Sequence, residues 1–283
     1  MNEDKRTVEP AIVTELTEVL SHLVVRYRLA EDLVIAPKES PIVLRKNKVL
    51  SERLHCFMSL VEALALDVPP LKGKKVLDVG TGVGAAALAF AFYQADVFAI
   101  DVDTKFLSVA DEFLSLAKTK AASRNLLLGR VQFYKISAES LAFPNSVFDF
   151  IVCSDVLEHV PCPIRTLKEI YRVLKPGGTL LIRQGFALNP HFLRRDPHYG
   201  LPLVTLMPEL LRAVIVVQLV GRCHRVRDKK WPFTHNHLRR WLGKSGRYRV
   251  LRWQKDGAQK GWLGFLLART AYSSLLLEKL GPT

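Results

Sequence analysis

Three closely spaced glycines follow a short apolar segment and form the motif of this chain with the clearest chemical meaning. The segment 76–79 ends at Gly80, Gly82 and Gly84 follow at every second position, and an alanine-rich stretch at 85–91 has helix-forming composition. Glycine allows a sharp turn and a close approach of the backbone to a ligand. The first turn of the helix then presents unpaired N–H groups. This order predicts a nucleotide-binding loop, with a purely structural turn as the alternative.

Two acids further along the chain bear on which nucleotide this loop would bind. The loop alone leaves the choice open, because it also satisfies the relaxed dinucleotide pattern G-x-G-x-x-G/A. Asp101 ends a second apolar segment about twenty residues after Gly80, where an acid accepts hydrogen bonds from ribose hydroxyls. The alternative is that Asp101 or Asp103 caps a helix that begins near Thr104. Asp103 suits the cap better, because helix-forming residues follow it directly.

Strand-like and helix-like segments alternate beyond this point. Strand patterns at 131–136 and 148–153 are followed by a helical pattern at 164–174, and a Pro-Gly-Gly turn at 176–178 leads into a further strand at 179–182. Alternation of this kind predicts an α/β fold with an open, mostly parallel sheet and helices on both faces. Because ligands of such sheets bind beyond the carboxyl ends of the strands, we expect the site there.

Four segments of the chain together resemble a known family. They lie at 76–84, 99–103, 148–160 and 174–182 and read VLDVGTGVG, AIDVD, FDFIVCSDVLEHV and LKPGGTLLI. In this order they resemble class I S-adenosylmethionine-dependent methyltransferases, most of all the type 11 group that contains the ubiquinone and menaquinone biosynthesis enzymes. The resemblance implies a Rossmann-like sheet of seven (or six) strands and S-adenosylmethionine as cofactor. The last two segments have no counterpart in the dinucleotide fingerprint, which argues against an NAD-dependent oxidoreductase.

The resemblance also implies which residues surround the cofactor. The glycine loop would hold the methionine half, the end of the second strand the ribose, the segment 137–139 the adenine, and the end of the fourth strand the sulfonium and the incoming acceptor. The family has an acid where this chain has Ser137, so the adenine contact would lack a charge. The cofactor residues implied are Asp78, Gly80, Thr81, Gly82, Asp101, Val102, Ser137, Ala138, Glu139, Ser154 and Asp155.

Four residues are candidates for catalysis. The sulfonium already activates the methyl group, so the protein aligns a nucleophile and excludes water. A general base helps if the acceptor is a hydroxyl or an acidic carbon. His159 is the nearest titratable residue in the shared motifs, and its alternative role is structural, at the start of the following helix. His191, His198 and Tyr199 follow the fifth strand, where this fold often builds the acceptor pocket; packing within a loop is the alternative.

Charge divides the chain of 283 residues into two parts. The net charge is +14, and residues 184–283 alone carry 18 Lys/Arg against 5 Asp/Glu. Apolar stretches at 201–220 and 262–277 flank a basic one at 222–231. Their uninterrupted apolar runs are shorter than the ~20 residues of a spanning helix. Attachment to an anionic membrane surface is therefore a hypothesis, and packing into the core or a homodimer interface is the alternative.

Nucleic acid is the other usual partner of a basic face, but it is disfavoured here. The chain has no zinc-ligand spacing, no RNA-binding module signature and no Asn-Pro-Pro-Tyr-like motif after the fourth strand. The four cysteines are scattered, which predicts no metal site and no disulfide framework and fits a reducing cytoplasm. Residues 1–6 are charged, and no apolar core of the signal-peptide type follows them, so we expect no secretion. We expect a cytoplasmic protein, with peripheral membrane attachment as the hypothesis above.

The sequence predicts three regions. Residues 1–70 would form a helical lid with helices at 8–29 and 51–66, or a helical pair that only packs on the sheet edge. Residues 71–184 would form the cofactor-binding core. Residues 185–283 would complete the sheet and carry a substrate-facing insertion.

The pattern is weakest near the last strands. A sixth strand is predicted at 248–253, whereas no clear seventh strand is present, and 262–267 could be strand or helix. The whole stretch 262–277 has the composition of a helix.

The favoured function is methyl transfer from S-adenosylmethionine to oxygen or carbon of a small-molecule, lipid-linked or saccharide-linked acceptor. The alternatives are a cofactor-binding protein of the same fold without turnover, an RNA or DNA methyltransferase, and an NAD-dependent oxidoreductase. The sequence determines neither the acceptor nor the oligomeric state.

Overall fold

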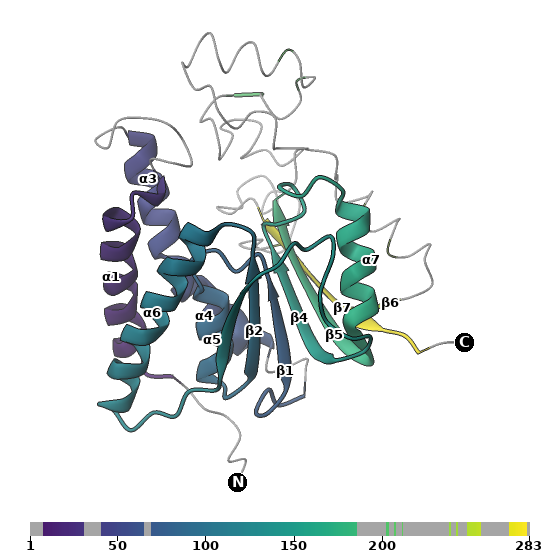
Figure 1. Cartoon of the computed structure of the whole chain (residues 1–283), viewed down its shortest axis with the longest axis horizontal. Helices are drawn as coiled ribbons and strands as arrows, with labels where there is room; N and C mark the ends of the chain where they lie inside the picture. The colour runs from purple at the N-terminus through teal and green to yellow at the C-terminus, as the bar shows by residue number, and fades with distance from the viewer. Residues whose placement is uncertain are drawn as a thin grey trace.

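The structure is a computed structural model that describes residues 8–30, 41–64, 69–185, 248–255 and 272–281, with Pro202, Leu203, Met207, Leu211, Leu238 and Leu242. In the described ranges helices precede the first strand, and the part from β1 to β5 consists mainly of alternating strands and helices, as the sequence predicts (Figure 1). The elements are α1 (Pro10–Arg26), α3 (Pro41–Ser51), α4 (Arg53–Leu64), β1 (Lys75–Val79), α5 (Ala85–Phe92), β2 (Asp96–Asp101), α6 (Thr104–Ala122), β3 (Val131–Lys135), β4 (Phe148–Ser154), α7 (Pro163–Val173), β5 (Leu174–Gly185), β6 (Tyr248–Lys255) and β7 (Tyr272–Lys279).

The strands form one seven-stranded sheet in the order β3-β2-β1-β4-β5-β7-β6. The first five strands in this order, β3 to β5, are parallel to one another. The strand β7 is antiparallel to both β5 and β6. The prediction of a mostly parallel, Rossmann-like α/β sheet is therefore confirmed.

The strand order reverses at β1, and this reversal positions the site. Val79, the last residue of β1, pairs with Ile100 of β2 on one side and with Cys153 of β4 on the other. The chain leaves β1 for α5 and β4 for α7, on opposite faces of the sheet (Figure 1). Ligands of open α/β sheets bind in the crevice that such a reversal leaves beyond the carboxyl ends of the strands.

Helices cover both faces of the sheet, and one face carries two helical layers. α5 and α6 lie against the sheet, with α4 packed on α5 and α1 packed on α6, while α7 covers the opposite face (Figure 1). Every residue of α5 is buried, because the sheet lies on one side of the helix and α4 on the other. An alanine-rich helix that is apolar all round suits this position.

Successive strand residues enter two different hydrophobic cores. Val76 packs among the residues of α1, α4, α5 and α6, whereas Leu77 packs with Leu167 and Ile170 of α7. This is the alternation that a strand imposes on its side chains. It also explains why these strands read as continuous apolar segments, since both faces are covered.

The N-terminal region contains a helix that the sequence analysis did not predict. The helix predicted at 51–66 is α4, whereas α3, which begins at Pro41, is additional. Proline is well tolerated at the start of a helix, because its missing N–H would have no partner there. In addition, α1 and α4 pack on the helices that cover the sheet and not on the sheet edge. Residues 31–40 lie outside the described residues.

The C-terminal strands correct the prediction for 262–277. The sixth strand is confirmed as β6, but residues 272–277 are strand β7 and not helix. Leu275, Leu276 and Leu277 are all buried, because β7 lies between two strands and both of its faces are covered. A short apolar run of this kind has no periodicity that separates helix from strand. Residues 256–271 lie outside the described part of the chain.

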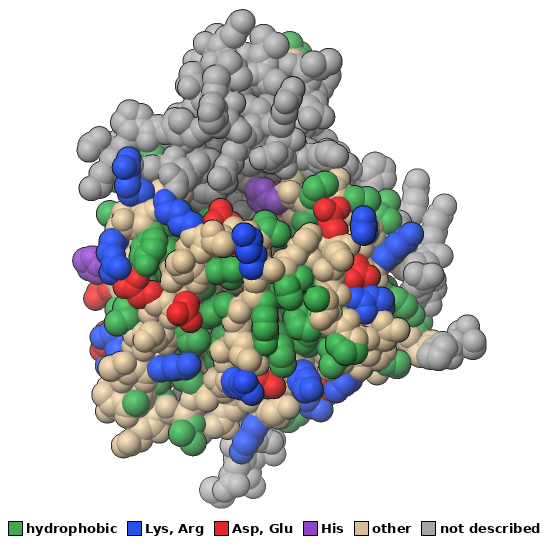
Figure 2. All heavy atoms as spheres, viewed as in Figure 1, with side chains coloured by type: hydrophobic (Ala, Val, Ile, Leu, Met, Phe, Trp, Pro, Cys, Tyr) green, Lys and Arg blue, Asp and Glu red, His purple; other side chains and the backbone are tan. Residues whose placement is uncertain are grey.

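The surface of the described residues mixes both signs of charge. On the face in Figure 2, Lys and Arg side chains are interspersed with Asp and Glu. This agrees with the sequence, where the excess of basic residues lies beyond residue 183. Within the described ranges, no helix combines the length and the apolar character needed to cross a membrane.

Candidate active site

The glycine loop makes a close contact with the segment that follows β4. Gly80, Gly82 and Gly84 have φ angles of 67°, 54° and 78°, which glycine adopts without strain. A Cβ atom on Gly80 would lie 2.5 Å from Cγ2 of Val156, so a larger residue does not fit there. A Cβ on Gly82 would meet no atom closer than Cδ1 of Phe106, at 3.9 Å. The absence of a side chain at Gly80 therefore lets the loops after β1 and β4 approach each other closely. At Gly82 it leaves space next to the backbone.

Asp101 ends β2, and backbone amides of the two adjoining loops donate to its carboxylate. Its Oδ2 accepts a hydrogen bond from the Gly82 amide at 2.9 Å, and its Oδ1 accepts one from the Asp103 amide at 3.0 Å. Asp103 caps α6 by accepting from the Lys105 amide at 2.9 Å, as predicted for it. Burial raises the pKa of Asp101. A carboxylate has about four acceptor positions, so Asp101 retains capacity for a further donor.

Asp78 is buried beneath the same loop. Its Oδ2 accepts a hydrogen bond of 2.6 Å from the Thr81 hydroxyl, which fixes the carboxyl group against the turn. The pKa of Asp78 is raised to about 7: burial is the main cause, the Thr81 hydrogen bond opposes it, and the nearby charge of Asp101 acts in the same direction as burial. Near neutral pH this carboxyl group therefore exists in both protonation states.

The segment predicted to hold adenine is divided between surface and core. Ser137 is exposed and its hydroxyl accepts a hydrogen bond from the Glu139 amide at 3.3 Å, while Ala138 is buried. The Glu139 carboxylate accepts a hydrogen bond of 2.8 Å from the Cys162 amide, so it holds the loop that precedes α7. Val102, beside Asp101, is exposed.

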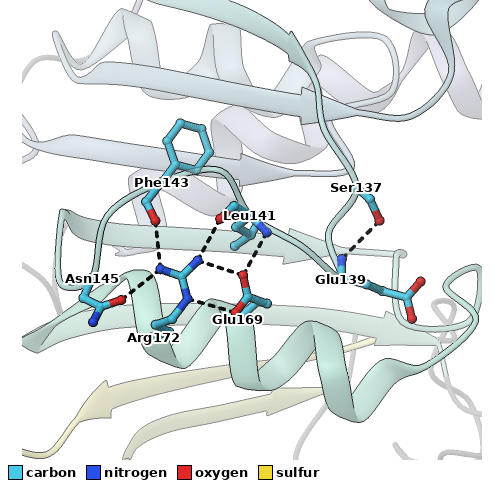
Figure 3. A network of polar contacts seen from close by, with 7 residues as sticks. All are labelled: Ser137, Glu139, Leu141, Phe143, Asn145, Glu169 and Arg172. Carbon is cyan, nitrogen blue, oxygen red and sulfur yellow. Dashed lines mark hydrogen bonds and ion pairs between the residues drawn. The ribbon is translucent and has the colours of Figure 1, made fainter.

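Arg172 of α7 fixes the loop that continues from this segment (Figure 3). Its guanidinium donates to the carbonyls of Leu141 and Phe143 at 2.7 and 2.8 Å, to Asn145 Oδ1 at 2.9 Å, and to both oxygens of Glu169. Glu169 also accepts from the Leu141 amide at 2.8 Å. The hydrogen bonds from Arg172 hold the pKa of Glu169 below its usual range. The network ties residues 141–145 to α7.

Arg172→Met is expected to destabilise the fold by about 2 kcal/mol, because two backbone carbonyls and a carboxylate lose a charged donor. The measurement is urea denaturation, together with hydrogen exchange at the Leu141 amide, which should become faster. Arg165→Met is the matched control, since Arg165 is an exposed residue of the same helix. Equal destabilisation by the two variants would contradict the role assigned to the network.

A buried group of charges lies at the carboxyl end of β4. Ser154 is buried, and its hydroxyl is 3.4 Å from Asp155 Oδ2. The same Oδ2 lies 2.9 Å from Arg53 Nη1 of α4 and 3.5 Å from Arg183 Nη1 of β5. Asp155 has a φ of 58°, a strained value for a residue with a side chain. Such strain clusters at functional sites.

Glu158 is a buried carboxyl group that the sequence analysis missed. Its Oε2 accepts a hydrogen bond of 2.6 Å from Nε2 of Gln184, at the end of β5. Burial raises the pKa of Glu158 to about 7, and the charge of Asp155 adds to this effect, while the hydrogen bond from Gln184 opposes it. Glu158 directly precedes His159 in the shared motif at 148–160, and this position could have identified it as a candidate site residue. For Arg53, on a distant helix, the sequence offered none.

The predicted catalytic residues fall in different places. His159 is exposed in the turn after β4, ahead of the start of α7 at Pro163, and its Nε2 lies 4.0 Å from Glu158 Oε1. His191, His198 and Tyr199 lie outside the described residues. In the described ranges, no group of three or more His, Cys, Asp or Glu side chains is arranged to hold a metal ion.

Comparison with known proteins connects this geometry to one family. Residues 77–182 match the family model described as a methyltransferase domain, and the match extends from β1 to β5. Residues 77–182 form a methyltransferase domain. Within the domain lie the glycine loop, Asp101, Asp155 and Glu158, and the predicted resemblance is confirmed over this range.

Curated relatives match a part of the chain of similar length. The ubiquinone biosynthesis O-methyltransferase of Paracidovorax citrulli is 39% identical over 110 residues, which are 38% of this chain and 42% of that protein. The uncharacterized methyltransferase YcgJ of Bacillus subtilis is 33% identical over 123 residues, which are 44% of this chain and 43% of that protein. The chain thus spans less than half the length of these relatives.

Solved structures share the fold of the methyltransferase domain over a longer range. An S-adenosylmethionine-dependent methyltransferase from Methanosarcina mazei has a TM-score of 0.51 at 24% identity and covers 78% of this chain and 98% of its own. The [4+2]-cyclase SpnF has a TM-score of 0.54 at 20% identity and covers 94% of this chain and 96% of its own. At these identities the likeness supports the fold alone.

Proposed function

We propose that this protein transfers a methyl group from S-adenosylmethionine to an acceptor bound at the carboxyl edge of β4 and β5. The observation that carries the proposal is Asp101, held by the glycine loop at the end of β2 with a carboxylate that can still accept a hydrogen bond. In class I folds an acid at this position binds the ribose diol. The match of residues 77–182 to a methyltransferase domain supports the same assignment.

The remaining residues fit the other parts of the cofactor. The room above Gly82 and the buried carboxyl group of Asp78 suit the methionine half with its ammonium group. The exposed hydroxyl of Ser137 can hydrogen-bond the adenine amine. Bound S-adenosylmethionine would supply a methyl group that its sulfonium already activates. Ser154 and Asp155 would orient the acceptor, and water exclusion would complete their contribution.

The acceptor is a small molecule, a lipid or a lipid- or saccharide-linked group, methylated on oxygen or carbon. Relatives named as ubiquinone biosynthesis O-methyltransferases support oxygen as the first atom to test. If proton removal is needed, His159 and Glu158, which both follow β4, are the candidate bases. In this proposal His191, His198 and Tyr199 contribute to the acceptor pocket, and the basic region 185–283 attaches the protein to anionic membranes.

The proposal extends to the division of the chain. Residues 71–184 bind the cofactor, and residues 1–70 act as a lid over the acceptor. The ion pair between Arg53 of α4 and Asp155, with Nη1 and Oδ2 2.9 Å apart, supports the lid, because it brings the N-terminal helices to the end of β4. Residues 185–283 supply β6 and β7 together with the acceptor-facing insertion.

Calorimetric titration with S-adenosylhomocysteine tests the cofactor. We expect binding by the wild type, and Asp101→Ala should weaken it by about 30-fold, because two charged hydrogen bonds to the ribose are lost. Asp103→Ala is the matched control: it removes a neighbouring carboxylate that caps α6 and should leave the affinity within about threefold.

NADH is titrated in parallel. Preference for NADH, or no binding of S-adenosylhomocysteine, would contradict the proposal. Methyl transfer from labelled cofactor in an acceptor screen then separates an enzyme from a binding protein of the same fold.

A further inference from the structure

Three carboxyl groups converge where the loops after β1 and β4 meet. Asp78 lies on β1, and Asp155 and Glu158 follow β4, the neighbouring parallel strand. The two loops are in close contact, since a Cβ on Gly80 would lie 2.5 Å from Val156 Cγ2. We refer to Asp78, Asp155 and Glu158 as the carboxyl cluster.

The carboxyl cluster is buried and incompletely neutralised. Asp78 and Glu158 are 2% and 7% exposed, and the Asp155 side chain is 10% exposed. Burial first, and then the charges of Glu158, Asp78 and Asp155, raise the pKa of the Cys153 thiol, so all three carboxyl groups act on one buried atom between them. Oδ1 of Asp155 is buried without a hydrogen-bond partner among the described residues. A buried acceptor without a donor is costly and calls for a ligand.

The surrounding cations pair more directly with Asp155 than with the other two members of the carboxyl cluster. Arg53 and Arg183 both approach Asp155. Glu158 has the neutral amide of Gln184 on one oxygen and His159, 4.0 Å away, beside the other, with the charge of Arg53 as a smaller influence. Asp78 faces Thr81 and the like charge of Asp101, with Arg53 as a more distant cation. Burial raises the pKa of both Asp78 and Glu158 to about 7, so these two carboxyl groups respond to any further charge.

We propose that Glu158, supported by Asp78 and Asp155, determines the preference of this site for the positively charged methyl donor over its neutral thioether product, and that this preference increases with pH. The inference rests on the proposed function, since it concerns the same cofactor. It assigns to Glu158 a role in cofactor discrimination, separate from any role in proton removal.

The physical argument is a linkage between proton and cofactor binding. A sulfonium near Asp78 and Glu158 stabilises their ionised forms and lowers their pKa values beyond the effect of the ammonium group, which the neutral thioether product shares. Below pH about 6 Asp78 and Glu158 are protonated and discriminate little between the two ligands by charge. Above pH about 7 both are ionised and attract the ammonium group that the two ligands share, but only the methyl donor also offers them a sulfonium. If the sulfonium lowers the carboxyl pKa by about one, the ratio of the two dissociation constants changes by about tenfold.

The experiment measures the dissociation constants of S-adenosylmethionine and S-adenosylhomocysteine from pH 5.5 to pH 8.5 by calorimetry on the full chain. For the wild type, we expect the preference for S-adenosylmethionine to rise by about tenfold across this range, with a midpoint near pH 7. Glu158→Gln should reduce this rise to threefold or less and retain S-adenosylhomocysteine binding. Asp111→Asn, which removes an exposed carboxylate of α6, is the control and should leave the rise unchanged.

In two further variants we expect the pH midpoint of this preference to move in opposite directions. Gln184→Leu removes a hydrogen bond that favours ionised Glu158, so the midpoint should move to higher pH. Asp155→Asn removes a like charge, so the midpoint should move to lower pH. A residue with a purely structural role would not produce two displacements of opposite sign.

Two outcomes would overturn the inference. One is a ratio of dissociation constants that is the same at every pH in the wild type, and the other is a pH dependence that persists unchanged in Glu158→Gln. Either result, with both ligands bound, leaves the proposed function standing. Absence of binding by both ligands would instead refute the proposed function itself.

Discussion

Asp78→Asn is expected to stabilise the folded protein increasingly as the pH rises. Burial raises the pKa of Asp78 from 3.8 to about 7, so ionisation of this group opposes folding. A change of that size corresponds to about 4 kcal/mol at pH 8. Asparagine has nearly the same shape, cannot ionise and can still accept the hydrogen bond from Thr81. The variant avoids the ionisation cost at the expense of the charge proposed to bind the cofactor.

The sign follows from counting protons. Between pH about 4 and pH about 7 the folded protein keeps a proton on Asp78 that the unfolded chain has released. Stability conferred by such a group is present at low pH and is lost as the pH rises towards the folded pKa. Glu158, whose pKa is raised from 4.5 to about 7, acts in the same direction. The wild type should therefore become less stable over this range.

Urea denaturation at pH 5 and pH 8 measures this effect. The free energy of unfolding of Asp78→Asn minus that of the wild type should increase by about 2–3 kcal/mol from pH 5 to pH 8. Asp149→Asn is a control of opposite sign. Burial acts to raise the pKa of Asp149, but the hydrogen bond and charge of Lys175, the backbone amide of Lys75 and the charge of Lys74 together lower it. Its loss should therefore destabilise the protein at pH 8. A constant difference between Asp78→Asn and the wild type would refute the prediction.

Gly80→Ala should destabilise the protein by about 3 kcal/mol and greatly weaken S-adenosylhomocysteine binding. Two costs add. An alanine at a φ of 67° is strained by about 1 kcal/mol, and its Cβ would lie 2.5 Å from Val156 Cγ2, which forces a displacement costing about 2 kcal/mol. Because Val156 lies in the loop after β4, the displacement reaches both halves of the site.

A second glycine in this protein separates the two costs. Gly73 has a φ of 71°, and a Cβ there would meet nothing within 4 Å, so Gly73→Ala should lose only about 1 kcal/mol. Val156→Ala in combination with Gly80→Ala should restore part of the binding, because the clash is relieved. If Gly73→Ala and Gly80→Ala were equally destabilising in urea denaturation, the steric argument would fail.

The sequence was informative where local chemistry determines the structure. Asp101 and Asp103 are only two residues apart, yet their separate roles at the strand end and the helix cap followed from what precedes and follows each of them. The glycine loop was equally local, since a turn into a helix requires few residues. The order of strands and helices up to β5 was predictable for the same reason.

Contacts between distant segments were not predictable. Arg53 precedes Asp155 by about a hundred residues, and nothing in the motif around either residue indicates the ion pair. Glu158 reads as an ordinary charged residue until the end of β5 brings Gln184 against it. β7 was misread because three adjacent leucines fit a helix as well as a strand covered on both faces.

The position of β7 in the sheet has a consequence for how the protein is made. β5 ends at Gly185 and its partner begins at Tyr272, so 86 residues separate two strands that pair directly. A ribosome that adds about 5–20 residues per second needs roughly 4–17 s to cover that interval. Throughout this time one edge of β5 offers unpaired N–H and C=O groups. Late in the interval β6 is synthesised, still without the strand that joins it to the sheet. During synthesis this edge is the place where chaperones would be needed most and where nascent chains could pair with one another.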